Sequence, residues 1–188
     1  MNSYVMSMND WMAWENGVDL VALTTESAAA PNVIVHVARM VHTPVGSAPS
    51  GMIFWQPDSA AAPVVMGFVS TCSKVGAYFG PKIFAGTPFE NAPVLDAVIT
   101  FSGEGDSASA RVEVGGHVFE ASLHGLGAAE LINRSPAATA PFQQQGLEKV
   151  AQSASLTVDG QSVNVILPPV GISGGPAAVF SPCGIYAR

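Results

Sequence analysis

The sequence predicts a mainly β protein, an antiparallel and barrel-like single domain over residues 1–188 with a few short helices. Two observations predict this class. The sequence contains two hairpin patterns with short glycine turns. It also contains one long strand pattern in which odd- and even-numbered positions are both apolar. A strand with two apolar faces has to be covered on both sides, as in a barrel wall or a sheet packed against a second layer. We expect at least eight strands in one such domain.

The first predicted element is a short helix over residues 9–15, which ends near Gly17. The run from Val33 to Val41 is apolar at odd and even positions alike, so we expect a strand buried on both faces. Residues 52–56 and 64–69 are shorter apolar runs bounded by turn residues, and both are predicted strands.

The clearest local pattern lies over residues 110–121, where two alternating runs flank Gly115-Gly116. Two glycines between such runs predict a two-residue hairpin turn with positive φ. The resulting register places Arg111 opposite Glu120, an ion pair worth about a few tenths of a kcal/mol. Ahead of this hairpin, residues 94–101 resemble the 33–41 run, and we expect them to be buried on both faces as well.

Two more short helices are predicted over residues 128–133 and 143–152. A second hairpin follows over residues 154–165, with Asp159-Gly160 as a type I′ turn pair. Residues 177–186 complete the predicted elements as a final strand.

The charge balance excludes several classes of protein. Seven Lys and Arg face fourteen Asp and Glu, the net charge is −7, and charged residues make up only 11% of the chain against 48% hydrophobic residues. We therefore expect neither a disordered chain nor a nucleic-acid binder. No apolar run approaches the roughly 18 residues of a membrane span, so no membrane association is expected. So few charges predict a homo-oligomer, although a neutral surface of Ala, Gly and Ser is an alternative.

The chain start and the cysteines indicate the compartment. The start at Met1–Tyr4 carries no Lys or Arg and no apolar stretch follows, so we expect no signal peptide and a cytoplasmic location. Cys72 and Cys183 form neither a disulfide framework nor a zinc motif. We expect both to be free cysteines.

Motifs for cofactors and metals are absent from the sequence. It has no G-x-S-x-G elbow, P-loop, H-E-x-x-H or C-x-x-C, so we expect no metal, flavin or nicotinamide cofactor. His36 and His42 stand roughly 20 Å apart along a straight strand, and His124 lies about 13 Å from Glu120, too far to share an ion. One interpretation is that all four histidines, including His117, are structural side chains that are hydrogen-bonded or exposed. The other is that His36 or His124 is catalytic.

Two of the three lysines are candidate nucleophiles. Lys82 sits in the apolar stretch Tyr78–Phe84. Burial in such surroundings favours the neutral amine that forms a Schiff base with a carbonyl. Lys74 is the second candidate. The alternative for both is a stem that lies over apolar surface with its amine in water.

The order of several segments resembles the acetoacetate decarboxylase superfamily. These segments are residues 63–70, the Gly-Pro-Lys-Ile-Phe run within 78–86, the strand from Val94, the hairpin over 110–121 and the end at 179–186. The resemblance implies a strand that ends in a glycine, a lysine-bearing loop, a strand over the Gly-Pro-Lys run and a hairpin. It also implies a closed or nearly closed β-barrel with a central cavity.

The family's catalytic groups are not matched. Its decarboxylases carry an adjacent Pro-Lys-Lys, in which one lysine makes the other more acidic, whereas this chain has Ser73-Lys74-Val75. The family's Arg-Glu pair is replaced by Phe68-Val69, and the stretch from Val33 to Trp55 holds no Asp or Glu. The resemblance therefore implies the fold and not the decarboxylase activity.

The function expected from these patterns is a cofactor-independent lyase, isomerase or cyclase. It would act on a small carbonyl-containing metabolite in an apolar barrel cavity, as in secondary-metabolite biosynthesis. The alternative is a non-catalytic barrel that binds a small molecule. The catalytic candidates are His36, His124 and Lys82, and the ligand-binding candidates are Trp55, Phe84 and Lys74.

On the most apolar strand, we expect His36 and not Arg39 to point into the barrel. The two residues are three positions apart, so their side chains lie on opposite faces of a regular strand and only one can face the barrel lumen. Arg39 is the costlier residue to bury, and we expect it to reach solvent or a carboxylate. Glu120 is expected to be structural through its pairing with Arg111, which leaves His124 free to act.

Overall fold

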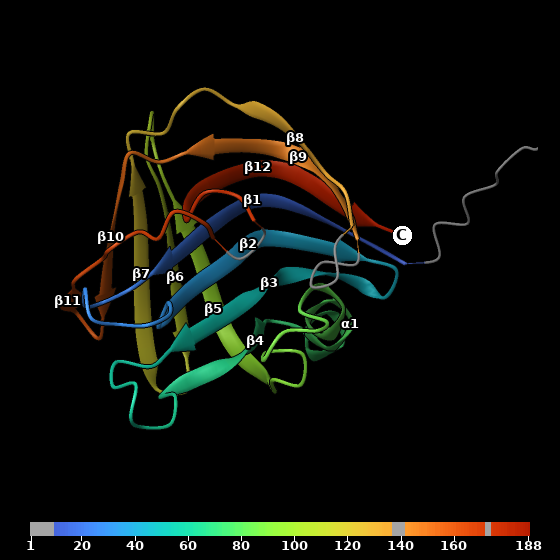
Figure 1. The fold of residues 1–188 in the computed structure, drawn as a ribbon. Coiled ribbons are helices and arrows are strands. Elements are labelled where there is room, and N and C mark those ends of the chain that lie inside the picture. The colour runs from blue at the N-terminus through green and yellow to red at the C-terminus, as the bar shows by residue number, and fades with distance from the viewer. Residues whose placement is uncertain (1–9, 137–141, 172–173) are drawn as a thin grey trace, which may run out of the picture.

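The computed structural model describes residues 10–136, 142–171 and 174–188. Its elements are β1 (Trp11–Ala22), β2 (Val33–Thr43), β3 (Gly46–Trp55), β4 (Val65–Ser70), α1 (Ser73–Ile83), β5 (Val94–Ser102), β6 (Ala108–Val114), β7 (His117–His124), β8 (Glu130–Arg134), β9 (Gln143–Val150), β10 (Ser153–Val158), β11 (Gln161–Val163) and β12 (Ala178–Ala187). The strands form one 12-stranded sheet in the order β11-β10-β7-β6-β5-β4-β3-β2-β1-β12-β9-β8 (Figure 1). The mainly β fold class is thereby confirmed.

The sheet curves like a barrel wall and does not close, since β11 and β8 remain its two edges. Figure 1 shows β6, β7 and β10 on one side of the central strands and α1 on the other. Between the central strands and β6, β7 and β10 lies an inner core, which contains Val18, Val35, Val112, Phe119 and Leu156. Burial of these apolar side chains between the two halves of one sheet is what bends it.

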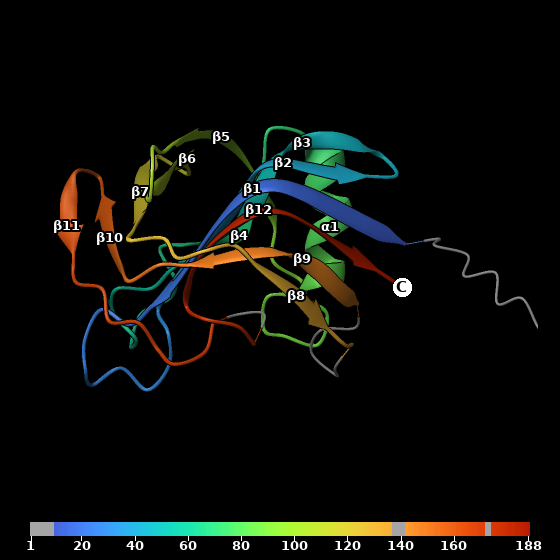
Figure 2. The ribbon, with the colours of Figure 1, turned by 90° about the horizontal axis from the view of Figure 1, so that it is seen from above.

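The helix α1 covers the opposite face of the central strands (Figure 2). Here an outer core forms, which includes Met52, Phe68, Phe79 and Phe84. Strands β4 and β5 are the one parallel pair among the named strand pairings, and a parallel pair needs a crossover, which α1 supplies. Gly80 allows the close approach of α1 to β4, because a Cβ there would lie 2.3 Å from the ring of Phe68.

Several predicted elements agree with the structure in detail. Strand β2 is buried on both faces, with Val35 in the inner core and Ile34 in the outer core. The hairpin β6–β7 has the predicted register, with Arg111 opposite Glu120. The hairpin β10–β11 likewise pairs Leu156 with Val163.

All three predicted helices are wrong where the structure describes them. Residues 10–15 lead into and form part of β1, residues 130–133 lie in β8, and residues 143–150 are β9. Cross-strand packing overrides the weak helix preference of these short segments. Asn9 and the chain start at Met1–Tyr4, on which the signal-peptide expectation rests, lie outside the described residues.

Two further expectations are corrected. The run from Tyr78 to Ile83, a strand by the family resemblance, belongs to α1. Strand β5 is covered mainly on one face, and Val98 on its other face is 56% exposed. No helix in the described part of the chain is long and apolar enough to cross a membrane.

Candidate functional site

A line of irregular pairing crosses β2, β1 and β12 and creates the site. Asn16 in β1 has a left-handed backbone with φ of 51°. The pairing of β2 with β3 shifts between Ala38 and Val41, and that of β12 with β9 shifts between Phe180 and Cys183. Irregularities of this kind re-aim side chains and are common beside active sites. In β1, Trp14 precedes the irregularity and Asp19 follows it, yet both line the same cavity.

The cavity lies between these strands, β9, β3 and α1. Its lining includes Trp14, Asp19, His36, Gln144, Glu148 and Tyr186. The free volume is about 30 Å³, which holds one or two water molecules or the reacting end of a larger molecule. Its polar groups stand out because the surrounding outer core is apolar and aromatic.

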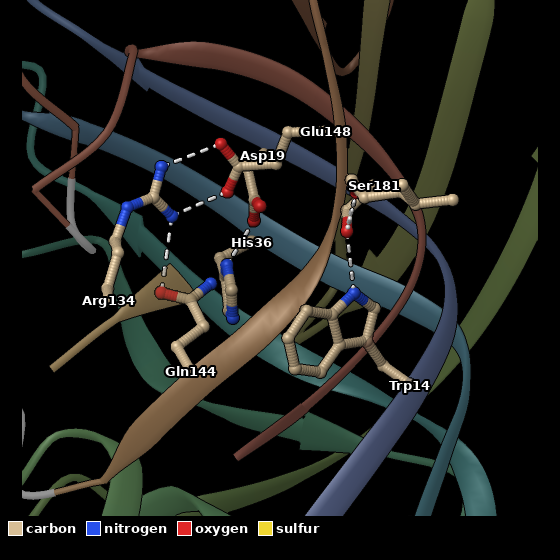
Figure 3. Close-up of polar contacts among 8 residues, drawn as sticks. Trp14, Asp19, His36, Arg134, Gln144, Glu148 and Ser181 are labelled. Carbon is tan, nitrogen blue, oxygen red and sulfur yellow. Dashed lines mark hydrogen bonds and ion pairs between the residues drawn. The ribbon is translucent and has the colours of Figure 1, made fainter. Parts of the chain in front are cut away.

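His36 and Asp19 form the central pair of the cavity (Figure 3). They are direct partners in the β1–β2 register, and His36 Nδ1 pairs with Asp19 Oδ1. Burial lowers the pKa of His36, but the charge and hydrogen bond of Asp19 outweigh it and raise that pKa above 6.5. An imidazole bound through Nδ1 keeps Nε2 for a proton transfer, with its tautomer fixed by the carboxylate.

A second ion pair stands beside the first. Arg134 of β8 donates from Nη1 to Glu148 Oε1 at 2.6 Å and from Nη2 to Glu148 Oε2 at 2.7 Å, and Glu148 lies on β9. Nη1 also donates to Gln144 Oε1 at 3.2 Å (Figure 3). The Glu148 side chain is only 8% exposed. The hydrogen bonds of Glu148 raise the pKa of Arg134 against the opposing effect of burial, so the guanidinium of Arg134 stays charged.

Tyr186 and Trp14 form the aromatic wall. Their ring centroids are 4.8 Å apart, and Trp14 Nε1 donates to Ser181 Oγ at 2.9 Å (Figure 3). Burial and the carboxylates of Asp19 and Glu148 raise the pKa of Tyr186, which remains a neutral phenol and hydrogen-bond donor. Gly184 leaves room for Trp14, because a Cβ at Gly184 would lie 2.1 Å from the indole.

The arrangement suits acid–base chemistry. Asp19 and Glu148 carry two negative charges against the one positive charge of Arg134, so a protonated His36 makes the group neutral. This balance agrees with the direction of the His36 pKa shift. An imidazole held at Nδ1 by a carboxylate can accept a proton at Nε2 and return it.

Of the residues predicted for the site, His36 and Phe84 come together. Their ring centroids are 6.0 Å apart with the planes at 85°, so the edge of one ring meets the face of the other. Arg39 points away from this cavity and binds Glu15 Oε2 at 2.9 Å, as parity predicted. The Phe84 side chain is itself buried in the outer core.

The other predicted site residues lie elsewhere. Lys82 binds Asp10 and lies 3.8 Å over the ring of Tyr78, so it has an ion-pair partner in place of purely apolar surroundings. Lys74 is exposed in the first turn of α1. Trp55 belongs to the inner core. His124 is exposed at the end of β7, where its Nε2 lies 3.3 Å from Ser155 Oγ.

The sequence patterns gave no indication of most polar residues in this cavity. Asp19 lies beyond the helix predicted for residues 9–15, and only the β1–β2 register brings it opposite His36. Gln144 and Glu148 share one face of β9 with Gly146 between them, a pattern that also fits one face of a helix. Among the described residues, no three His, Cys, Asp or Glu side chains gather closely enough to hold a metal ion.

Comparison with known proteins gives one structural match to report. No protein-family model and no curated protein matches the chain. Among solved structures, the chain is similar to the acetoacetate decarboxylase of Legionella pneumophila subsp. pneumophila. The TM-score is 0.39 and the identity 11%, over 95% of this chain and 85% of the other. That protein bears the name of the family that the sequence resembles.

Proposed function

We propose that the chain is an enzyme that moves a proton on a small carbonyl-containing metabolite. In this proposal the His36–Asp19 pair is the acid–base group. The reaction class is a lyase, isomerase or cyclase step that needs no organic cofactor. The observation that carries the proposal is a histidine fixed by a carboxylate at the wall of a small cavity that also holds the aromatic side chains of Trp14 and Tyr186.

In the proposed step, His36 is the base and Tyr186 is the hydrogen-bond donor. Nε2 of neutral His36 takes a proton from the carbon next to a carbonyl, and the C–H electron pair moves onto the carbonyl oxygen to give an enolate. The neutral hydroxyl of Tyr186 stabilises that oxygen as a hydrogen-bond donor. When the enolate is conjugated with a neighbouring C=C bond, return of the proton from His36 to the far carbon of that bond completes an isomerisation. In a lyase reaction the carbonyl re-forms, a C=C bond forms, and the group on the next carbon leaves with its bonding electron pair and takes the proton from His36.

The free volume limits what enters. A cavity of about 30 Å³ admits the reacting carbonyl end and not a whole metabolite. The rest of the substrate would then lie toward the opening of the cavity. Small 2-oxo and 3-oxo acids and short ketones are the compounds of this size and chemistry.

Proton exchange in D2O tests the proposal without a known product. The protein is incubated with a set of 2-oxo acids, 3-oxo acids and short ketones, and loss of the α-proton signal is followed by NMR. We expect catalysed exchange for at least one compound, and His36→Gln should slow it by about a hundredfold or more. Asp19→Asn should slow it by a smaller factor, because Asp19 acts through His36.

The control is a second His–Asp pair on the surface. His117 at the start of β7 binds Asp159 in the β10–β11 turn at 2.8 Å, and neither residue lines the His36 cavity. His117→Gln should leave exchange unchanged. Exchange that is equally fast in His36→Gln, or absent with every compound, contradicts the proposal. Binding of a compound with no exchange indicates instead a non-catalytic small-molecule carrier.

The lysines provide a second version of the enzyme. A Schiff-base route through Lys82 or Lys74 would form an imine between the amine and the substrate carbonyl with loss of water. Treatment with borohydride and each compound, followed by intact mass, distinguishes the two versions. A trapped adduct on either lysine favours the imine, and its absence together with full activity of Lys82→Ala and Lys74→Ala favours the histidine route.

A further inference from the structure

A larger groove lies away from the His36 cavity, on the side of the central strands that carries the inner core. It has a free volume of about 360 Å³, within the range typical of small-molecule sites. Eight segments meet there, namely β1, β2, β5, the β5–β6 turn, β6, the segment after β7, β9 and β12. Its lining includes neither His36 nor Asp19, which places it outside the proposed catalytic cavity.

The walls of the groove are apolar. Val18, Phe101, Leu126 and Phe180 line it from four of these segments. All four also contact or belong to the inner core, so their positions are set by packing. A site with such walls takes up a hydrocarbon or aromatic group.

The charges at the groove are unlike those of the protein as a whole. Two cations, Arg39 and Lys149, and one carboxylate, Glu104, line it, although the chain has a net charge of −7. Arg39 already shares its charge with Glu15 at 2.9 Å. Within residues 10–136, 142–171 and 174–188, no carboxylate lies within ion-pair distance of Lys149. Lys149 is therefore the cation left to meet an incoming anion.

A strained residue marks the same place. Asn16 lines the groove and holds the left-handed φ of 51° described above. Backbone held in this region by a residue other than glycine often accompanies a binding site, although asparagine adopts it more readily than most residues. In the strand beyond it, Val18 lines the groove and Asp19 lines the His36 cavity.

We propose that this groove is a second site, which binds a small amphipathic carboxylate. The apolar body of the ligand lies against Phe101 and Phe180, and its carboxylate pairs with Lys149 and Arg39. The inference does not depend on the proposed enzyme activity, because the residues of the two sites are different.

Calorimetric titration with 4-phenylbutyrate and with its uncharged analogue 4-phenylbutanamide tests the proposal. The carboxylate should bind in a 1:1 ratio and more tightly than the amide. Lys149→Gln should weaken binding of the carboxylate about fivefold or more and leave binding of the amide unchanged. Glu104→Gln removes the opposing charge and should tighten binding of the carboxylate.

The matched control is Arg111→Gln, which removes an exposed cation on β6 outside this groove and should not change the affinity. Amide chemical shifts provide a second readout that does not rely on any variant. On addition of 4-phenylbutyrate, residues 103–105 and Leu126 should shift, and His36 and Asp19 should not. Absence of binding, an equal loss in Lys149→Gln and Arg111→Gln, or shifts centred on His36 would each overturn the proposal.

Discussion

At the scale of single residues, His36 links stability to pH. Asp19 raises the pKa of His36 in the folded chain above its unfolded value of about 6.5, despite the opposing effect of burial. A group with a raised folded pKa stabilises the protein fully below the unfolded pKa, and that contribution is lost as the pH rises through the folded pKa. His36→Gln should therefore lower the free energy of unfolding by about 1–3 kcal/mol more at pH 5.5 than at pH 9.

Urea unfolding at both pH values measures this difference. The same substitution at His124, whose ring meets a serine hydroxyl at 3.3 Å on the surface, is the control. A cost of His36→Gln that is equal at both pH values, or larger at pH 9, would show that Asp19 does not stabilise the imidazolium.

The ion pair between half-buried Arg134 and buried Glu148 predicts a second effect at this scale. Glu148→Gln leaves Arg134 with a neutral partner in a site where the lost carboxylate was only 8% exposed. We expect a loss of about 2–4 kcal/mol in the free energy of unfolding, since removing one member of a buried pair is costly. Glu113→Gln, which breaks an exposed contact to Arg111, should be close to neutral in the same urea titration.

At the scale of elements, the contact of α1 with β4 depends on Gly80. In an exposed helix, Gly→Ala stabilises by about 1 kcal/mol. Here the new methyl group would lie 2.3–2.6 Å from three atoms of the Phe68 ring. Gly80→Ala should thus destabilise by about 1–3 kcal/mol, because overpacking exceeds the gain in helix propensity.

Thermal unfolding of Gly80→Ala and of Ala77→Gly separates the two effects. Ala77 is exposed in the same helix, so its replacement reports helix propensity alone. A rise in melting temperature for Gly80→Ala would mean that α1 is not held against Phe68 as the structure has it.

Elements with a strong local pattern could be predicted from the sequence. The two hairpins have turn pairs that set the register, and the two-sided run of β2 can only be a covered strand. The segments in β1, β8 and β9 have no such pattern, and their pairing with distant strands decides their structure. Residues 78–83 are helical for a different long-range reason. Strands β4 and β5 are parallel, and a parallel pair requires a crossover connection between them.

The site was predictable only where it rests on the predicted elements. The alternation of side chains along β2 predicted that His36 points inward and that Arg39 reaches a carboxylate or solvent. In the structure His36 binds Asp19 and Arg39 binds Glu15. Asp19 and Glu148 lie on β1 and β9, two strands for which the sequence suggested short helices. Asp19 meets His36 through the β1–β2 register, whereas Glu148 reaches the same cavity because β12 pairs both with β9 and with β1, at the far end of the chain sequence. No local pattern in β1 or β9 encodes these registers.

At the scale of the whole molecule, the sheet leaves β8 as an open edge strand. Leu131 in this strand is 81% exposed, more than any other large hydrophobic side chain in the described residues. An unprotected edge with an exposed apolar residue is a surface on which a second chain can pair. Charged residues make up only 11% of the chain, so few charged side chains are available to protect such an edge.

We therefore expect the protein to form a homo-oligomer through β8, and light scattering at micromolar concentration is the measurement. Leu131→Lys places a charge on the edge and should shift the particle toward the monomer mass of 19.3 kDa. Val98→Lys is the matched control, because Val98 is also exposed, at 56%, but lies on β5, which is paired on both sides within the sheet. It should leave the assembly unchanged. A wild-type particle of 19.3 kDa would refute the oligomer itself. If the oligomer persists in Leu131→Lys but dissociates in Val98→Lys, the interface lies on the outer face of β5 and not at the sheet edge.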